Sequence, residues 1–241
     1  MILIAGDSWG CGEWGASSPD GSDYGVTHGG LCQYLRDKNY SVINLSIGGS
    51  CNWNIYKSIQ SFFDSGIPKY ISEPIDLVLV FQTEWIRDFK HPNIYSCVND
   101  NHKIAAITCW QHRLSEIAIK YNIKIGLIGG CSDTLYFDNF EKEHPNLFIA
   151  CQSFTNLCTN DEHKIEDPTF FCRPDNVVLP KMEQHYKKYS SKKELINDLD
   201  KGISRLDTWK YNKQWFYPDG KHANRHAHKK LFDFLSDRKI F

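Results

Sequence analysis

The length, composition and charge of the chain exclude several classes of protein. Its 241 residues carry 28 Lys and Arg against 29 Asp and Glu, so no basic excess points to nucleic acid and no acidic excess points to disorder. Nine cysteines without a CxxC pair favour reduced thiols in a cytoplasm over a disulfide framework or a zinc site. We recognise neither a signal peptide nor a membrane-spanning segment, and therefore expect a cytoplasmic protein with a single domain over residues 1–241.

The chain opens with an apolar run, Met1 to Ile4, that predicts a strand. Gly6-Asp7-Ser8-Trp9-Gly10 follows directly and predicts a tight, glycine-flanked turn. In an open α/β sheet, such a turn places the next side chain at the carboxyl edge of the sheet, where ligands bind. Ser8 is therefore a candidate nucleophile if a base and an orienting carboxylate can reach it.

Residues 10–28 are rich in Gly, Ser and Asp and predict a loop. Gly10 to Gly15 matches the dinucleotide pattern GxGxxG, but the residues that follow do not predict the helix that this motif must open. Gly6 to Gly10 also matches the GxSxG nucleophile elbow, which normally lies mid-chain after several strands. We therefore expect neither a nucleotide site nor an elbow of that type.

The rest of the chain alternates between strand-like and helix-like stretches. Strands are predicted at 41–45, 76–81, 123–128 and 146–151, and the composition of 41–45 predicts a buried strand. Helices are predicted at 30–38, at 52–63 with Asn52 as the cap, and at 103–121, 192–212 and 224–237. Residues 152–190 predict an irregular insertion. This alternation predicts a three-layer α/β/α sandwich whose central parallel sheet is covered on both faces.

Four short blocks together resemble the SGNH (GDSL-type) serine hydrolase family. Gly6-Asp7-Ser8 resembles its first block, Asn44 to Gly49 its second, and Asp219-Gly220-Lys221-His222 its last. The third block departs, because Gln82-Thr83-Glu84-Trp85 stands where the family has Gly-x-Asn-Asp. The resemblance covers residues 1 to about 90 and 215 to 238. It implies the SGNH-hydrolase, flavodoxin-like type of fold and an esterase that uses no cofactor.

The residues of these blocks suit nucleophilic catalysis. Ser8 becomes a nucleophile when an imidazole accepts its proton, and His222 can do so while Asp219, three residues earlier, orients the ring. The resemblance implies that the backbone N–H groups of Ser8 and Gly49 form the oxyanion hole. Each such donor stabilises the transition state by roughly 3 kcal/mol.

Glu84 is the residue that fits this chemistry least. A carboxylate in place of the family's asparagine repels an oxyanion by about 4 kcal/mol at 4 Å and an effective dielectric constant near 20. Arg87 lies three residues further on and can neutralise Glu84 and turn it away, which leaves Gln82 or Thr83 as a third donor. An ordinary ion pair beside a hole of two backbone donors is the alternative.

Aromatic residues flank the blocks and give the only indication of a substrate. Trp14 also lies beside the first block; the candidates for substrate binding are Trp9, Trp53, Trp85, Arg87 and Trp215. Their rings can pack on a sugar or another flat group, although core packing is the ordinary role of tryptophan. We expect His226 and His228 to be solvated helix residues and predict no metal site.

The function predicted from the sequence is a cofactor-free serine esterase. Its substrate would be a short O-acyl ester of a small molecule or a carbohydrate, with neither nucleic acid nor a membrane as partner. A thioesterase or lysophospholipase is kept as an alternative enzyme, although no long apolar lid segment supports a lipid substrate. From a different class, a catalytically impaired member of the fold that serves as a binding module stays open because of Glu84.

Overall fold

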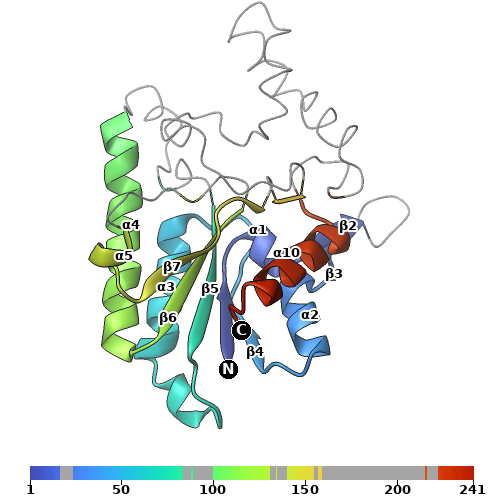
Figure 1. Cartoon of the computed structure of the whole chain (residues 1–241), viewed down its shortest axis with the longest axis horizontal. Helices are drawn as coiled ribbons and strands as arrows, with labels where there is room; N and C mark the ends of the chain where they lie inside the picture. The colour runs from blue at the N-terminus through green and yellow to red at the C-terminus, as the bar shows by residue number, and fades with distance from the viewer. Residues whose placement is uncertain are drawn as a thin grey trace, which may run out of the picture.

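The structure is a computed structural model that describes residues 1–16, 24–83, 88, 100–130, 134, 140–154, 157, 158, 215 and 222–241. Its central element is a five-stranded parallel sheet (Figure 1). The strands in chain order are β1 (Ile2–Ala5), β4 (Val42–Asn44), β5 (Leu77–Gln82), β6 (Lys124–Gly129) and β7 (Leu147–Cys151). Across the sheet they lie in the order β4-β1-β5-β6-β7. The chain therefore reverses its direction of winding between β1 and β5, and the carboxyl ends of these two strands lie side by side.

The centre of the sheet is apolar because its strands are buried on both faces. All six residues of β5 and all four of β1 are buried. β4 differs from the buried strand that its composition predicts, since its three residues are only partly buried. β4 is an edge strand and pairs with β1 alone in this sheet, which its sequence does not reveal.

Helices cover both faces of the sheet, as the alternation of elements predicts. α2 (Gly30–Asp37) and α10 (Arg225–Asp237) pack on one face, where Leu31, Leu35 and Leu231 join a core with Ile4 and Phe81. Figure 1 shows these two helices together on one side of the strands.

The other face of the sheet is covered by α3 (Asn52–Asp64) and α4 (Asp100–Tyr121). Ile59 and Leu114 of these helices pack there against Leu3 and Val80. Two short helices, η1 (Ile67–Tyr70) and α5 (Phe140–Glu143), also lie between the strands. The prediction of a parallel sheet between two helical layers is confirmed for the described residues.

A second, two-stranded sheet corrects the loop predicted at 10–28. β2 (Glu13–Ala16) pairs antiparallel with β3 (Tyr24–His28), just after the short helix α1 (Ser8–Cys11). Gly15 and Gly25 lie within the two strands, and the hairpin is held by contacts to α10, over two hundred residues away. Local composition cannot show such contacts. Gly10 to Gly15 leads into β2 and not into a helix, as expected.

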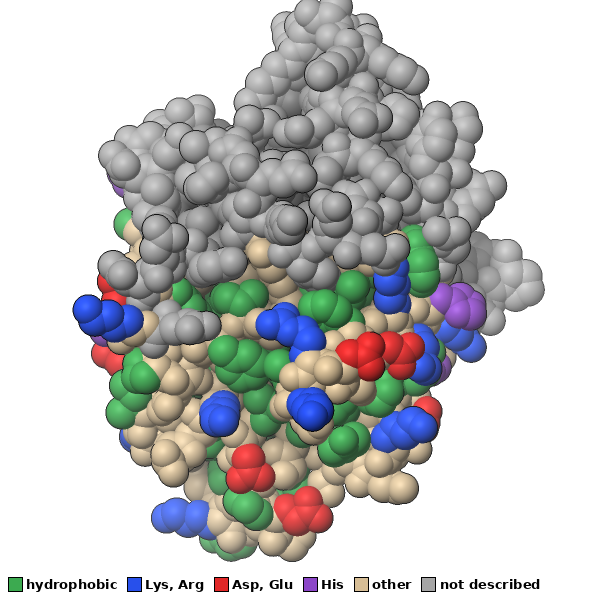
Figure 2. Space-filling view, viewed as in Figure 1, with side chains coloured by type: hydrophobic (Ala, Val, Ile, Leu, Met, Phe, Trp, Pro, Cys, Tyr) green, Lys and Arg blue, Asp and Glu red, His purple; other side chains and the backbone are tan. Residues whose placement is uncertain are grey.

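Several predictions fall on residues that the structure does not describe. The predicted helix at 192–212 lies outside the described residues, and so does the insertion at 152–190 apart from 152–154, 157 and 158. None of the helices in the described ranges is both long and apolar enough to cross a membrane. On the face drawn in Figure 2, basic and acidic side chains are interspersed over the described surface.

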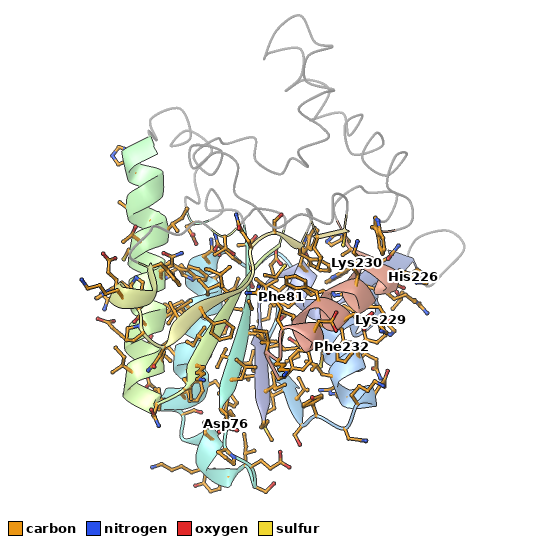
Figure 3. The ribbon with its side chains drawn as sticks, viewed as in Figure 1. Asp76, Phe81, His226, Lys229, Lys230 and Phe232 are labelled. Carbon is orange, nitrogen blue, oxygen red and sulfur yellow. The ribbon has the colours of Figure 1, made fainter. Side chains whose placement is uncertain are left out.

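A hollow lies at the amino edge of the sheet. Its volume is about 840 Å³, and its lining includes Met1, Asp76, Phe148 and Phe241. In Figure 3, Asp76 marks this end of the structure, whereas Phe81 lies toward the opposite edge. Ser8 follows the carboxyl end of β1, so the hollow and the predicted nucleophile lie at opposite edges of the sheet.

Candidate active site

Ser8 occupies a sharp turn directly after β1. The Asp7 carboxylate accepts a hydrogen bond from the Trp9 N–H at 2.9 Å and so caps α1, whose first residue is Ser8. The turn is tight because Gly10 N–H and Cys11 N–H both donate to the Asp7 carbonyl, at 3.1 Å each. Only 7% of Ser8 is exposed, so the expected nucleophile lies at the carboxyl edge of the sheet but is largely shielded.

The second block lies against this turn. Asn44, the last residue of β4, donates from Nδ2 to the Gly10 carbonyl at 2.9 Å and accepts the Ser46 N–H at 2.9 Å. A turn follows that contains Gly49, whose φ of +78° lies in the left-handed region that favours glycine. A Cβ built on Gly49 would meet no atom within 4 Å, so its backbone borders open space. The two predicted oxyanion donors thus lie on adjacent turns.

Trp14 connects the expected nucleophile to the expected base. Its indole N–H donates to the Ser8 carbonyl at 2.8 Å. Its ring also lies against the His222 imidazole, with 5.7 Å between centroids and a tilt of 31°. Ser8 and His222 come from opposite ends of the sequence, and the structure brings both into contact with one indole. Asp219, the expected orienting carboxylate, lies outside the described residues.

The segment that carries His222 is held by an ion pair between a buried carboxylate and a half-exposed arginine. Glu13, next to Trp14 in β2, is 2% exposed and accepts the Nη2 of Arg225 at 2.8 Å and its Nε at 3.1 Å. The same carboxylate accepts the backbone N–H of Arg225 and, at 3.0 Å, the hydroxyl of Thr27. These bonds fix the start of α10, and with it the position of His222, against the β2–β3 hairpin.

The third block is tied to α3. The side chain of Asn52 forms two bonds with Thr83: its Oδ1 accepts the Thr83 N–H at 3.0 Å, and its Nδ2 donates to the Thr83 carbonyl at 3.0 Å. The backbone N–H of Thr83 is thus engaged and is not directed at an oxyanion. Gln82 is 2% exposed and its carbonyl accepts the Gly130 N–H at 3.2 Å. Glu84 lies outside the described residues.

The cap of α3 differs from the one predicted. Asn52 is the first helical residue and Cys51 is the N-cap, without a capping side-chain bond of its own. The carboxylate of Asp88 takes over this role, accepting the Trp53 N–H at 2.8 Å and Asn52 Nδ2 at 3.2 Å. Burial raises the pKa of Asp88 above the ordinary aspartate value, although these donors act in the opposite direction. Asn52 is a preferred capping residue, but its amide is used by the end of β5 instead.

The described aromatic candidates have three different environments. Trp9 is 3% exposed and packs edge-on against Phe154 at 5.2 Å, so its ring belongs to the core. Trp53 is 42% exposed at the start of α3, where a substrate can contact it. The Nζ of Lys230 lies over the Trp215 ring, 4.9 Å from the ring centroid. The Trp215 carbonyl accepts the Asn224 N–H at 2.8 Å. Trp85 and Arg87 lie outside the described residues.

The two histidines of α10 face opposite directions. His226 is exposed, as predicted, and Figure 3 shows it on the outer side of the helix with Lys229. His228 is 1% exposed, so the prediction of a solvated residue is wrong for it. Burial lowers its pKa to about 4. It packs edge-on against Phe154 at 5.3 Å and shares the buried face of the helix with Leu231 and Leu235.

Sequence reasoning missed four residues that build this site. Glu13, Asp88 and Arg225 have no pattern of their own, and Asn52 is predicted only as a cap, because each acts here through a partner that is distant in the sequence. Trp14 was recognised only as an aromatic neighbour of the first block. Its contact with His222 depends on the hairpin, which the sequence did not predict.

Comparisons with known proteins add no family. No protein-family model matches the chain, and a search of the curated proteins finds no match. The chemical interpretation therefore depends on the arrangement itself: a serine in a capped turn, a histidine within reach of the same indole, and a glycine turn open to solvent.

Proposed function

We propose that the protein is a serine hydrolase that cleaves a short O-acyl ester, with Ser8 as nucleophile and His222 as general base. The observation that carries the proposal is the contact of Trp14 with both residues, through the Ser8 carbonyl at 2.8 Å and the His222 ring at 5.7 Å. Two ends of the chain meet there, at the carboxyl edge of the sheet. The strand order also supports the SGNH-like, flavodoxin-like type of fold, because the second strand of the sheet in chain order lies outside the first and the third lies on its other side. Ligands of such sheets bind where the winding reverses.

The reaction follows from the chemistry of these groups. The Oγ of Ser8 attacks the ester carbonyl while His222 takes its proton, and the carbonyl oxygen becomes an oxyanion. The N–H groups of Ser8 and Gly49 are the proposed donors to that oxyanion. His222 then protonates the leaving alcohol, which leaves an acyl-enzyme on Ser8. Water, activated by the same imidazole, hydrolyses this ester, and Asp219 is assigned to orient the ring throughout.

The surroundings of the site support a small substrate. Gly49 borders open space, and the exposed indole of Trp53 and the side chain of Ile47, which is 60% exposed, belong to the elements that flank this turn. Flat, partly apolar surfaces of this kind suit a sugar ring or another compact alcohol. An O-acetylated carbohydrate is therefore the proposed substrate class.

Hydrolysis of p-nitrophenyl acetate tests the proposal. Ser8→Ala should abolish turnover while changing the thermal midpoint little, because it removes a single hydroxyl oxygen and keeps the Cβ of the side chain in place. Turnover should also fall as the pH falls, because a protonated imidazole cannot accept the serine proton. Full activity in Ser8→Ala would exclude the nucleophile. An inactive native protein would favour the binding module.

A further inference from the structure

Trp14 makes three contacts that no feature of the predicted reaction requires. Besides its bond to the Ser8 carbonyl and its contact with the His222 ring, it lies close to the glycine turn. A Cβ built on Gly48 would come within 3.0 Å of Cη2 and Cζ2 of the indole. The same side chain thus touches the elements that carry the nucleophile, the base and one of the proposed oxyanion donors.

The support of Trp14 is itself rigid. Glu13 precedes it in β2 and is held by four donors, three of them from Arg225. Arg225 begins α10, three residues after His222. The hairpin is therefore bound to α10 through Glu13, and the bond from Trp14 to the Ser8 carbonyl binds it to α1. A ring held in this way has little freedom to move independently of the three elements.

We infer that Trp14 is a positioning residue that sets the separation of Ser8 from His222 and the placement of the glycine turn. This inference rests on the proposed function, since it concerns the geometry of that same site. Proton transfer and nucleophilic attack are steep functions of distance, and a displacement of 1 Å can cost about a hundredfold in rate. An indole is suited to the task because its rigid ring has two faces, an edge and one directed N–H group.

Trp14→Phe tests the directed bond, because phenylalanine keeps an aromatic ring beside His222 but has no N–H for the Ser8 carbonyl. We expect kcat for p-nitrophenyl acetate to fall roughly ten- to a hundredfold. KM should stay within about twofold, because the substrate does not touch Trp14 in this account. A kcat within twofold of the native value, in a variant with native circular dichroism, would overturn the inference.

Gly48→Ala tests the position of the ring without altering Trp14. The new methyl group lies at 3.0 Å from the indole and must displace it, whereas the matched control Gly25→Ala in β3 meets no atom within 4 Å. We expect kcat to fall several-fold in Gly48→Ala and to be unchanged in Gly25→Ala.

The double variant Trp14→Phe/Gly48→Ala separates this effect from direct damage to Gly49. Phenylalanine lacks the outer indole atoms that the methyl group would strike, so Gly48→Ala should cost almost nothing in that background. Equal losses from Gly48→Ala in both backgrounds would show that the turn, and not Trp14, is affected, and would contradict the inference.

Fluorescence gives a readout that does not depend on turnover. The His222 ring lies against the Trp14 ring, so His222→Ala should change the emission of the native protein and should leave the emission of Trp14→Phe unchanged. If this difference is present but the native protein shows no hydrolysis, the proposed function fails; if the native protein hydrolyses the ester and Trp14→Phe does so equally well, only the positioning role fails.

Discussion

The carboxylate of Glu13 binds both the backbone N–H and the guanidinium group of Arg225, which lies 212 residues further along the chain. Glu13 is 2% exposed, whereas the side chain of Arg225 is 50% exposed. A carboxylate removed from water in this way is costly unless donors surround it. The pair therefore joins the beginning of the chain to its end at the point where the proposed nucleophile and base meet.

Arg225→Ala should destabilise the protein by about 3 kcal/mol, because it leaves a buried carboxylate without its charged partner. The free energy of unfolding in urea measures this loss. Arg113→Ala is the matched control, since Arg113 forms an exposed pair with Glu116 on α4 at 2.9 Å, and pairs of that kind contribute little. A similar loss in both variants would contradict a special role for Glu13 and Arg225.

Asn52→Ala should destabilise the fold. It removes two buried bonds to Thr83 and one to Asp88, at a cost of about 2–4 kcal/mol because the partners are left unsatisfied. Asn54, exposed on the same helix, provides the control, and Asn54→Ala should change stability by about 0.5 kcal/mol or less. Urea unfolding of the two variants checks the difference. Equal stabilities would mean that Asn52 does not hold the end of β5.

The buried imidazole of His228 predicts how stability depends on pH. Its folded pKa of about 4 lies below the ordinary value of 6.5, and burial is the main cause. His28 also lowers it, whereas Glu13 and the Gly12 carbonyl raise it without offsetting the burial. The unfolded chain therefore binds the proton more readily, so stability is fully present above pH 6.5 and is lost as the pH falls toward 4.

The loss amounts to about 3 kcal/mol, since each unit of pKa difference corresponds to roughly 1.4 kcal/mol. Urea unfolding between pH 4 and pH 7 measures it. His228→Leu should flatten most of this dependence, and His226→Leu, at an exposed position two residues earlier, should leave it in place. A steep dependence that persists in His228→Leu would assign it to other groups.

The sheet and its helices could be predicted from the sequence because their signals are local. β5 is a continuous apolar run, and α4 repeats apolar residues at helical spacing, so each element reveals itself without its partners. The sequence also indicates part of the buried face of α10, because His228, Leu231, Phe232 and Leu235 follow one another at helical three-and-four spacing. The prediction of a solvated residue is wrong because this apolar spacing, which continues through His228, places the imidazole on the buried face.

The hairpin and the residues that support the site could not be predicted, because their partners are remote in the sequence. Glu13 and Trp14 have no periodic signal, and β2 is stabilised by Arg225 and His222 at the other end of the chain. Asn52 follows the rule for a helix cap, but a tertiary partner, Thr83, competes for its amide. Local propensity is a weak guide wherever a buried polar group has such a partner.

Glu84→Asn tests the departure from the family pattern. Glu84 lies outside the described residues, but Thr83 before it and Asp88 after it both bind Asn52 at the start of α3. We expect kcat to change little and the melting temperature to fall, as it should if Glu84 is paired with Arg87 and turned away from the oxyanion. Steady-state kinetics and thermal melts of Glu84→Asn and Arg87→Ala check this. A large gain in kcat with unchanged melting would place the carboxylate at the oxyanion.

The central claim is that Ser8 is a nucleophile activated by His222, and covalent labelling with a fluorophosphonate tests it most directly. Intact mass and peptide mapping should locate one adduct, on Ser8, and its rate of formation should fall by several orders of magnitude in His222→Ala. Ser8→Ala should not react. Labelling at another residue, or labelling of Ser8 at the same rate without His222, would contradict the account.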